Sequence, residues 1–369
     1  MKGWRKIKVG LFKKTAALIC AAIIFCSFGA ISVFAERIVP VADPDFVDIT
    51  LEEFLEQNPG YQGYPDKAKR SISAYTVSGS VEWRQIGGKY YLYYTGTNTK
   101  VVNDWYYENG KWYFLKPGTG EMAISWCQVG SYWYYFNGGG AMQVDWYQVS
   151  GKWYYFRKAS IPNDGKPEGS MLVGAYYLPT SVGSTNATRN YYFDYYGAMQ
   201  DWLYPVAPNA SGNYPTSLSS CFNDPRGGPA VNHQGIDINK CDGQAVRCAT
   251  AGEVISSGYH PSMGNYVIQK SNVIGHIGNN LIIRYMHMQA DPKLAPGFQL
   301  SRGKELGQVG NTGESNGPHL HFDINFKNKS SSIVVADCLN PAAFFPNMTL
   351  TQGPTADVPP YGPNYNYAE

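Results

Sequence analysis

Short aromatic segments separated by polar and glycine-containing turns recur through the middle of the chain. Between residues 81 and 201 a leading tryptophan recurs at steps of 22, 21 and 20 residues, and a second aromatic run follows most of these positions. The leading tryptophans are Trp83, Trp105, Trp126 and Trp146, and the second runs begin at Trp112, Trp133 and Trp153. A period near twenty residues is typical of a repeat array. Two aromatic runs around a turn such as residues 149–152 predict a β-hairpin, and because one hairpin cannot bury its own face, we expect the hairpins to stack into a solenoid.

The rest of the chain divides by pattern into shorter regions. β-branched runs at 253–256, 266–269 and 281–285, separated by glycine-bearing turns, predict an antiparallel β domain. Near the start, Thr50 and Glu53 have the spacing of a capping box, which predicts a short helix ending near residues 58–60. The expected class is therefore mainly β. The expected boundaries are an N-terminal segment 36–80, repeats 81–201, a connector 202–219, the β domain 220–348 and a poorly ordered tail 349–369.

The first 35 residues have the layout of a secretory signal peptide. A basic stretch without acidic residues precedes an apolar run over residues 15–35, and Val33 and Ala35 occupy the small-residue positions of a cleavage site. An uncleaved membrane anchor is the alternative, because the apolar run is nearly long enough to span a bilayer. We expect a secreted protein.

Removal of this segment changes the charge and the cysteine count. Six basic residues lie in the leader, which leaves 24 basic and 28 acidic residues and a net charge of −4. That balance argues against nucleic-acid binding, which requires a basic face. Five cysteines remain, and export makes disulfides chemically possible, but an odd number leaves at least one thiol unpaired within the chain.

The six histidines all lie between residues 233 and 321, and several have the spacing of a metal site. A zinc hydrolase needs three protein ligands and one open position, which two imidazoles and a carboxylate can supply. Gly235 between His233 and Asp237 argues against a helical pair and favours a turn or strand end that bends both side chains toward one ion. His319 and His321 are two residues apart, so on a strand both project from the same face.

In this order, these residues resemble the lysostaphin-type (LytM-like) zinc endopeptidases. The matching positions are Phe222 with Arg226, His233-x-Gly-x-Asp237, Gly-Asn-Tyr-Val at 264–267, Tyr285-x-His287, Gly-x-Val-Gly-Asn-Thr-Gly at 307–313 and Gly-Pro-His-Leu-His-Phe-Asp at 317–323. The resemblance implies that His233, Asp237 and His321 bind Zn²⁺. It also implies that His287 and His319 activate water and stabilise the tetrahedral intermediate. His260 and His276 match no motif position, and we predict that they lie on the surface.

The sequence departs from the family pattern at the rim of this site. Asn-Asp-Pro at 223–225 replaces the usual tight segment before Arg226. Two cysteines flank the loop after Asp237. Because both changes alter the rim, the substrate preference of the family is not implied for this chain.

Four cysteines of the β domain are predicted to form two disulfides. A Cys241–Cys248 bond would close a short loop beside the predicted metal site, and a Cys221–Cys338 bond would join the start of the domain to its end. Such bonds stabilise mainly by restricting the unfolded chain. Zinc binding by these cysteines is the alternative, although their spacing lacks a CxxC pair.

The aromatic units resemble choline-binding, or cell-wall-binding, repeats, most closely at residues 143–156. The resemblance implies cages of aromatic rings between successive repeats, where ring faces attract a quaternary ammonium group. The implied cage residues are Trp105, Trp126, Trp133, Trp146, Trp153, Tyr135 and Tyr155. The alternative is that these rings only hold the solenoid together. Residues 159–190 interrupt the period, so the last site of the array is in doubt.

These resemblances predict a secreted zinc endopeptidase that cleaves peptide cross-links of bacterial peptidoglycan. The repeats would anchor it to choline-decorated teichoic acid or another wall polymer. Two alternatives stay open at this point. One is a non-catalytic wall-binding protein with a decayed peptidase scaffold, and the other is a zinc amidase or carboxypeptidase acting on the same polymer.

Overall fold

The computed structural model describes residues 46–63, 80–159, 162, 164–179, 188–226 and 232–345. The predicted signal peptide and the predicted tail lie outside these residues. Among the described residues, no helix combines the length and the apolar character needed to cross a bilayer.

The predicted helix is present as α1 (Leu51–Gln57), and its capping box is confirmed. The Glu53 amide donates to Thr50 Oγ1 at 3.2 Å, and the Thr50 amide donates to Glu53 Oε2 at 2.7 Å. These reciprocal bonds satisfy two amides that a helix start would otherwise leave unpaired.

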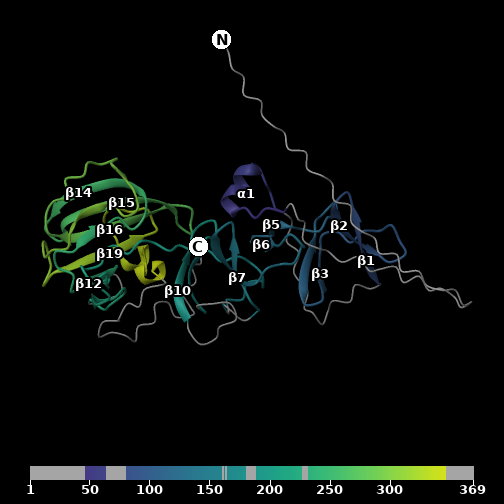
Figure 1. Ribbon diagram of the computed structural model, residues 1–369, viewed down its shortest axis with the longest axis horizontal. Coiled ribbons are helices and arrows are strands. Elements are labelled where there is room, and N and C mark those ends of the chain that lie inside the picture. Colours follow the sequence, from purple (N-terminus) through teal and green to yellow (C-terminus); the bar gives the residue numbers. More distant parts are fainter. Residues whose placement is uncertain are drawn as a thin grey trace, which may run out of the picture. The chain divides into compact units, whose positions relative to one another are not determined.

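The aromatic region folds into five antiparallel hairpins, each a two-stranded sheet (Figure 1). The hairpins are β1 (Val81–Ile86) with β2 (Lys89–Tyr94), β3 (Asp104–Glu108) with β4 (Lys111–Leu115), β5 (Ser125–Val129) with β6 (Tyr132–Phe136), β7 (Asp145–Val149) with β8 (Lys152–Phe156), and β9 (Gly174–Pro179) with β10 (Thr188–Phe193). The last hairpin arises partly inside residues 159–190. The sequence interpretation of that stretch as an interruption is therefore incomplete, because it contains the first strand of another hairpin.

One backbone contact recurs between successive hairpins. The Met142 amide donates to the Trp112 carbonyl at 2.9 Å, and the same bond links Met171 to Trp133 and Met199 to Trp153. A glycine two residues before each of these methionines packs against the methionine of the preceding unit: a Cβ on Gly140, whose φ is +75°, would lie 2.3 Å from Met122 Sδ. Equivalent clashes would occur at Gly169 and Gly197. The glycines of the repeat are thus required by close packing as well as by the turn.

The C-terminal region is built on an eight-stranded antiparallel sheet in the order β11-β12-β19-β16-β15-β14-β17, with β20 pairing β19. Its strands are β11 (Leu218–Ser220), β12 (Ile236–Asn239), β14 (Gly252–His260), β15 (Gly264–Ile274), β16 (Asn280–Met288), β17 (Gln299–Leu300), β19 (His319–Asn325) and β20 (Cys338–Leu339). A two-stranded sheet pairs β13 (Ala245–Arg247) with β18 (Glu305–Gln308), and two 3₁₀ turns, η2 (Val335–Asp337) and η3 (Pro341–Phe344), follow β19.

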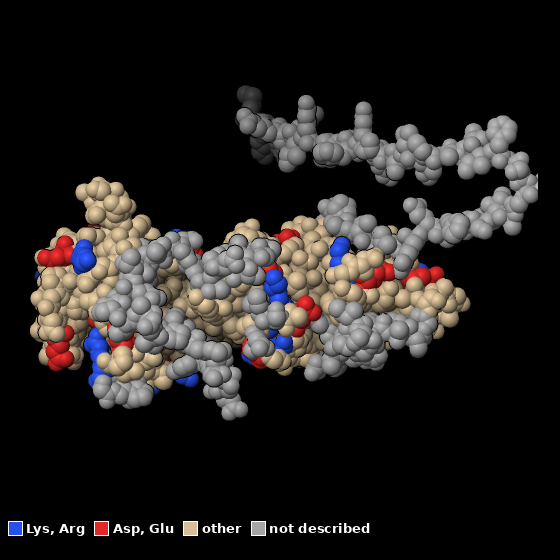
Figure 2. Space-filling model, turned by 90° about the horizontal axis from the view of Figure 1, so that it is seen from below, with Lys and Arg blue, Asp and Glu red and all other residues tan. Residues whose placement is uncertain are grey.

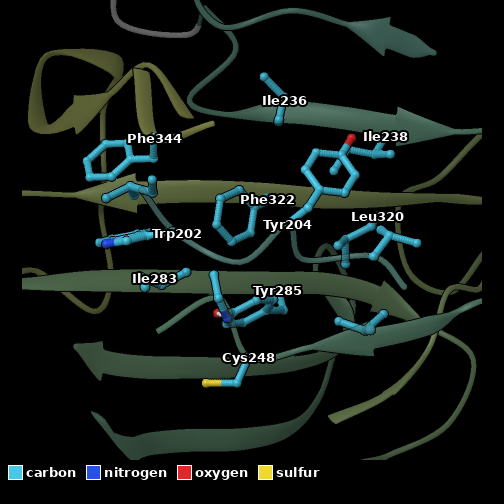
Figure 3. Close-up of a cluster of buried hydrophobic side chains, with 14 of the residues drawn as sticks. Trp202, Tyr204, Ile236, Ile238, Cys248, Ile283, Tyr285, Leu320, Phe322 and Phe344 are labelled. Atoms are coloured by element: carbon cyan, nitrogen blue, oxygen red, sulfur yellow. Dashed lines mark hydrogen bonds between the residues drawn. The ribbon is translucent and has the colours of Figure 1, made fainter. Parts of the chain in front are cut away.

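The two faces of this sheet have different chemistry, as the period of a strand requires. Leu320 and Phe322 of β19 point into the apolar core beside Ile236 and Ile238 of β12 (Figure 3). The alternate positions of the same strands carry polar side chains, so the core fixes the face on which those side chains stand.

The final hairpin contributes directly to this core. Tyr192 of β10 is fully buried and stacks on Phe344 with ring centroids 4.5 Å apart. The Tyr192 hydroxyl also lies 3.1 Å from His276 Nδ1, and the His276 ring packs on Phe326 at 4.9 Å. The prediction that His276 lies on the surface is only partly right, because the residue is half-buried between Tyr192 of the last hairpin and Phe326 of the C-terminal region. Burial, with a smaller contribution from Lys327, lowers the pKa of His276 to about 4.

Candidate active site

Three predicted metal ligands converge where β12 and β19 pair. Asp237 is directly opposite His321 in the register, and His233 precedes β12 by three residues. Asp237 Oδ1 lies 3.0 Å from His233 Nε2 and 2.8 Å from His321 Nδ1. The two imidazole nitrogens are 3.0 Å apart. Gly235 permits this bend, because a Cβ there would lie 2.3 Å from the Phe322 carbonyl oxygen.

This cluster fits a metal ion. One ligand atom from each of His233, Asp237 and His321 lies within 4.8 Å of the others. Two imidazoles and one carboxylate are a typical zinc donor set with an open fourth position. The hydrogen bonds of His233 support the same assignment: its Nδ1 donates to the Cys221 carbonyl at 2.8 Å, which leaves Nε2 directed at the cluster.

His321 is held between two carboxylates. Its Nδ1 faces Asp237, and its Nε2 lies 2.9 Å from Asp323 Oδ2. Burial alone would lower the pKa of His321, but hydrogen bonds to both carboxylates raise it to about 9. A metal binds a deprotonated imidazole nitrogen. Coordination through His321 Nδ1 would therefore leave the one remaining ring proton on Nε2, which faces Asp323.

Asp323 is in turn fixed by a buried guanidinium. Arg284 Nε donates to the two Asp323 oxygens at 3.0 and 2.9 Å, and Arg284 Nη2 donates to Gln234 Oε1 at 2.9 Å. Arg284 is directly opposite Asp323 in the pairing of β16 with β19. Burial would raise the pKa of Asp323, but Arg284 and His321 hold it below its usual value. The sequence interpretation included Asp323 in a motif without a role and did not include Arg284. The i,i+2 spacing of His321 and Asp323 was the available signal.

The two histidines predicted to activate water, His287 and His319, lie next to each other beside the three ligands. Their ring centroids are 4.7 Å apart. His287 Nδ1 donates to the Thr312 carbonyl and His319 Nδ1 to the Gly317 carbonyl, each at 2.8 Å, so both Nε2 atoms remain available. His319 Nε2 is 3.7 Å from Asp237 Oδ1. Burial lowers the pKa of His287 to about 4, which keeps this imidazole neutral near pH 7.

An irregularity in the sheet changes the direction of the backbone at His287. His287 has a φ of +62°, a conformation that is uncommon for residues other than glycine, and the register of β15 with β16 shifts between Asn265 and Val267. Its amide leaves the ladder and donates to the Met263 carbonyl at 2.9 Å. A bulge next to a site commonly redirects a side chain, and here it places His287 beside His319.

Asp237 has one further partner at the rim. Arg226 Nη2 donates to Asp237 Oδ2 at 3.1 Å, and half of the Arg226 side chain is exposed. Burial would raise the pKa of Asp237, but hydrogen bonds from His233 and His321 lower it well below its usual value. The carboxylate is therefore charged throughout the physiological range.

Part of the chain is similar to a known protein family. Residues 231–333 match the model of Peptidase family M23. The matched segment contains all five residues of the cluster just described. It covers less than a third of the chain, so the match concerns this domain.

Curated relatives match over similar lengths. Peptidoglycan DD-endopeptidase ShyA of Vibrio cholerae is 36% identical over 111 residues, which are 29% of this chain and 24% of the relative. Glycyl-glycine endopeptidase ALE-1 of Staphylococcus capitis is 32% identical over 93 residues, 25% of this chain and 24% of the relative. The chain spans about a quarter of the length of both relatives.

Solved structures match parts of the chain. The catalytic domain of lysostaphin from Staphylococcus simulans is 23% identical and covers 39% of this chain and 91% of its own, with a TM-score of 0.28. Choline binding protein F from Streptococcus pneumoniae is 29% identical and covers 36% of this chain and 39% of its own, with a TM-score of 0.26.

Among the described residues, no disulfide joins the cysteines of the C-terminal region, so neither predicted disulfide is present. The Cys241 thiol donates to the Ile238 carbonyl at 3.2 Å, and the Cys248 thiol donates to the Thr250 carbonyl at 2.8 Å. Cys338 lies on β20, and Cys221 follows β11, at separate places along the sheet. Short sequence separation therefore did not bring the sulfur atoms together. Burial raises the pKa of Cys241 to about 12 and that of Cys248 to about 11.

The predicted cage residues of the repeats differ in exposure. Trp105, Trp126, Trp146, Tyr135 and Tyr155 are buried among neighbouring rings. Trp133 is half-buried, and Trp153 is 41% exposed. Most of these rings thus contribute to the contacts between hairpins, and Trp153 offers the largest accessible aromatic surface of the seven.

Proposed function

We propose that this chain is a secreted, zinc-dependent endopeptidase that cleaves peptide cross-links of peptidoglycan and is held at the wall by its aromatic hairpins. The observation that supports it most is the convergence of His233, Asp237 and His321, with His287 and His319 beside them. Such a cluster needs five side chains from three strands and the segment before β12, each with its own hydrogen-bond partner. The M23 match and the named activities of the relatives support the same reaction class.

The chemistry follows from the side chains. Zinc, when bound by His233, Asp237 and His321, would lower the pKa of a water molecule and polarise the scissile carbonyl. The Nε2 atoms of His287 and His319 face the cluster and can accept the proton of that water and return it to the leaving amine. The Thr312 and Gly317 carbonyls hold both rings in the required tautomer.

The exposed ring of Trp153 supports the proposed wall binding. A flat, accessible indole suits stacking against a sugar or attraction of a quaternary ammonium group. On the face seen in Figure 2, basic and acidic side chains are interspersed and most of the surface is uncharged. Recognition there would depend on rings and hydrogen bonds more than on net charge.

The reaction is tested by incubating the full chain with purified cell walls and identifying new termini by mass spectrometry. New amino and carboxyl ends within peptide bridges are expected, and His319→Ala should slow their release by about 10²–10⁴-fold. Free lactyl groups on the sugars would instead indicate an amidase. A lack of any release by zinc-loaded protein would leave only a binding function.

Wall binding is tested on the full chain, because Tyr192 of the last hairpin is part of the M23 core and an isolated array would lose that cover. Trp153→Ala should reduce sedimentation with cell walls. Tyr259→Ala, which removes a 63% exposed ring from the M23 domain, is the control. Equal sedimentation of both variants and the unmodified chain would contradict anchoring through Trp153. Elution by millimolar choline would identify the ligand as choline rather than a glycan.

A further inference from the structure

The N-terminal segment, residues 46–61, covers one aromatic position of the array. Tyr61 stacks on Trp133 of β6 with ring centroids 5.4 Å apart and an interplanar angle of 26°. Phe54 of α1 meets the same indole edge-on at 6.1 Å and also contacts Tyr61 at 5.2 Å. Figure 1 shows α1 beside β5 and β6. Two rings of the segment thus pack on an indole to which the repeat resemblance gives a ligand-binding role.

Polar contacts fix the segment on the same hairpin. The Trp126 indole donates to the Ile49 carbonyl at 2.8 Å, and the Tyr135 hydroxyl donates to the Asp48 carboxylate. The Gln128 amide donates to the Tyr61 hydroxyl at 3.2 Å. The segment therefore forms hydrogen bonds with two predicted cage residues, Trp126 and Tyr135, and with Gln128 of the same hairpin, as a ligand would. Leu51 is 2% exposed and belongs to the apolar cluster of Trp126 and Tyr135.

The next hairpin shows the same position without this cover. Trp153 of β8 pairs with Gln148 as Trp133 pairs with Gln128, so the two indoles are equivalent in the repeat. Trp153 is nevertheless 41% exposed, and its ring contact is with Trp146 of its own hairpin. The N-terminal segment also touches this hairpin, through Leu51 in the apolar cluster of Tyr154 and Phe156 and through an ion pair of Glu52 with Lys152 at 3.6 Å, but no ring of the segment contacts Trp153 among the described residues.

We propose that residues 46–61 act as an internal occupant of the aromatic site around Trp133, which excludes a wall ligand from this hairpin and directs binding to Trp153. The inference rests on the proposed wall binding by the repeats. Tyr61 covers the ring face that a sugar or a quaternary ammonium group would use. Because the segment belongs to the same chain, its high effective concentration favours it over a free ligand.

Radical footprinting of the full chain tests this directly. Hydroxyl radicals oxidise accessible tryptophans, and fragment masses locate each oxidation. In the unmodified protein, Trp133 should be labelled more slowly than Trp153. In a Phe54→Ala/Tyr61→Ala variant the Trp133 rate should rise to match Trp153. Tyr177→Ala, which removes a 57% exposed ring from β9, should leave the Trp133 rate unchanged.

A single variant shows whether loss of the Tyr61 ring alone exposes Trp133. The single variant Tyr61→Ala should raise the Trp133 rate by a smaller amount, and it serves if the double variant fails to fold. Equal Trp133 rates in the unmodified protein and in the folded variants would overturn the proposal.

Purified cell walls added to the unmodified protein should slow labelling of Trp153 and leave Trp133 unchanged. Protection of Trp133 by walls would show that a ligand reaches the site and would also overturn the proposal. Failure of the walls to protect either ring or to sediment the protein would instead count against the proposed wall binding, because the free-protein rates are independent of it.

Discussion

Replacing Asp323 with asparagine tests how the carboxylate behind His321 supports the proposed metal centre. Asparagine keeps the shape and removes the charge at a fully buried position. His321 Nε2 would lose the anionic partner now 2.9 Å away. Loss of such a partner typically weakens metal affinity about 10–100-fold, which corresponds to about 1.4–2.8 kcal/mol. Arg284, whose side chain is 9% exposed, would keep its charge without an anion, at a cost of about 3–5 kcal/mol in stability.

Companion variants separate these two effects. Arg284→Met keeps the Asp323 carboxylate behind His321, so it should lose stability but little zinc affinity. The double variant should lose less stability than the two single variants combined, because the partners interact. Asp337→Asn is the control: it breaks the 2.7 Å ion pair of buried Asp337 with the largely exposed Lys329, elsewhere in the domain, so it should change stability alone.

Two measurements decide between a metal-positioning role and a structural one. Urea unfolding of the metal-free protein gives the stability of each variant, and competition with a chromophoric chelator gives its zinc dissociation constant. The expected pattern is weaker zinc binding in Asp323→Asn and in the double variant only. If Asp323→Asn lost stability but bound zinc as tightly as the unmodified protein, Asp323 would serve strand pairing alone and the reasoning would be refuted.

Three other predictions follow from the site, from a buried histidine and from the thiols. His321→Ala should lose both activity and most bound zinc, whereas His319→Ala should keep near-stoichiometric zinc and lose turnover by about 10²–10⁴-fold. Zinc content, measured together with the rate of wall lysis, checks this. The reverse pattern would exchange the roles of the two histidines. The folded pKa of His276, about 4, lies below its unfolded value of 6.5, so stability should fall as pH drops from 6.5 to 4, by at most about 3 kcal/mol. His276→Phe should remove that part of the acid sensitivity in urea unfolding at pH 4 and 7, and an unchanged pH dependence would show that the ring is not buried neutral. All five cysteines of the described chain should react with iodoacetamide after unfolding without reductant, and a peptide pair joined by a disulfide would contradict the free thiols.

Local patterns in the sequence were sufficient for several elements. The capping box at Thr50 and Glu53 depends on side chains three residues apart, and the helix begins where it predicts. The i,i+2 spacing of His319 and His321 places both on one face of a strand in any sheet. The repeated aromatic runs predicted hairpins because their turns lie within each unit. In each case the interacting residues are close in sequence, so composition and spacing carry the information.

Other features depend on contacts that no local pattern encodes. Asp237 meets His321 because β12 pairs with β19, 84 residues apart along the chain. Arg284 reaches Asp323 through the pairing of β16 with β19, and a bulge in the pairing of β15 with β16 redirects His287. Sheet order and register are set by the burial of a whole face, so they are decided when the domain packs.

The same reason explains the predictions that the structure corrected or extended. Cys241 and Cys248 are seven residues apart in number, but the surrounding sheet directs their thiols to different carbonyls. His276 has no motif, yet the last hairpin covers it with Tyr192. The segment of Phe54 and Tyr61 showed only a helix signal in sequence, and only the packed repeats reveal that it lies on Trp133. The sequence by itself determined the chemical groups and their local spacing, and the tertiary structure decided which of them meet, because long-range pairing depends on the packing of the whole chain.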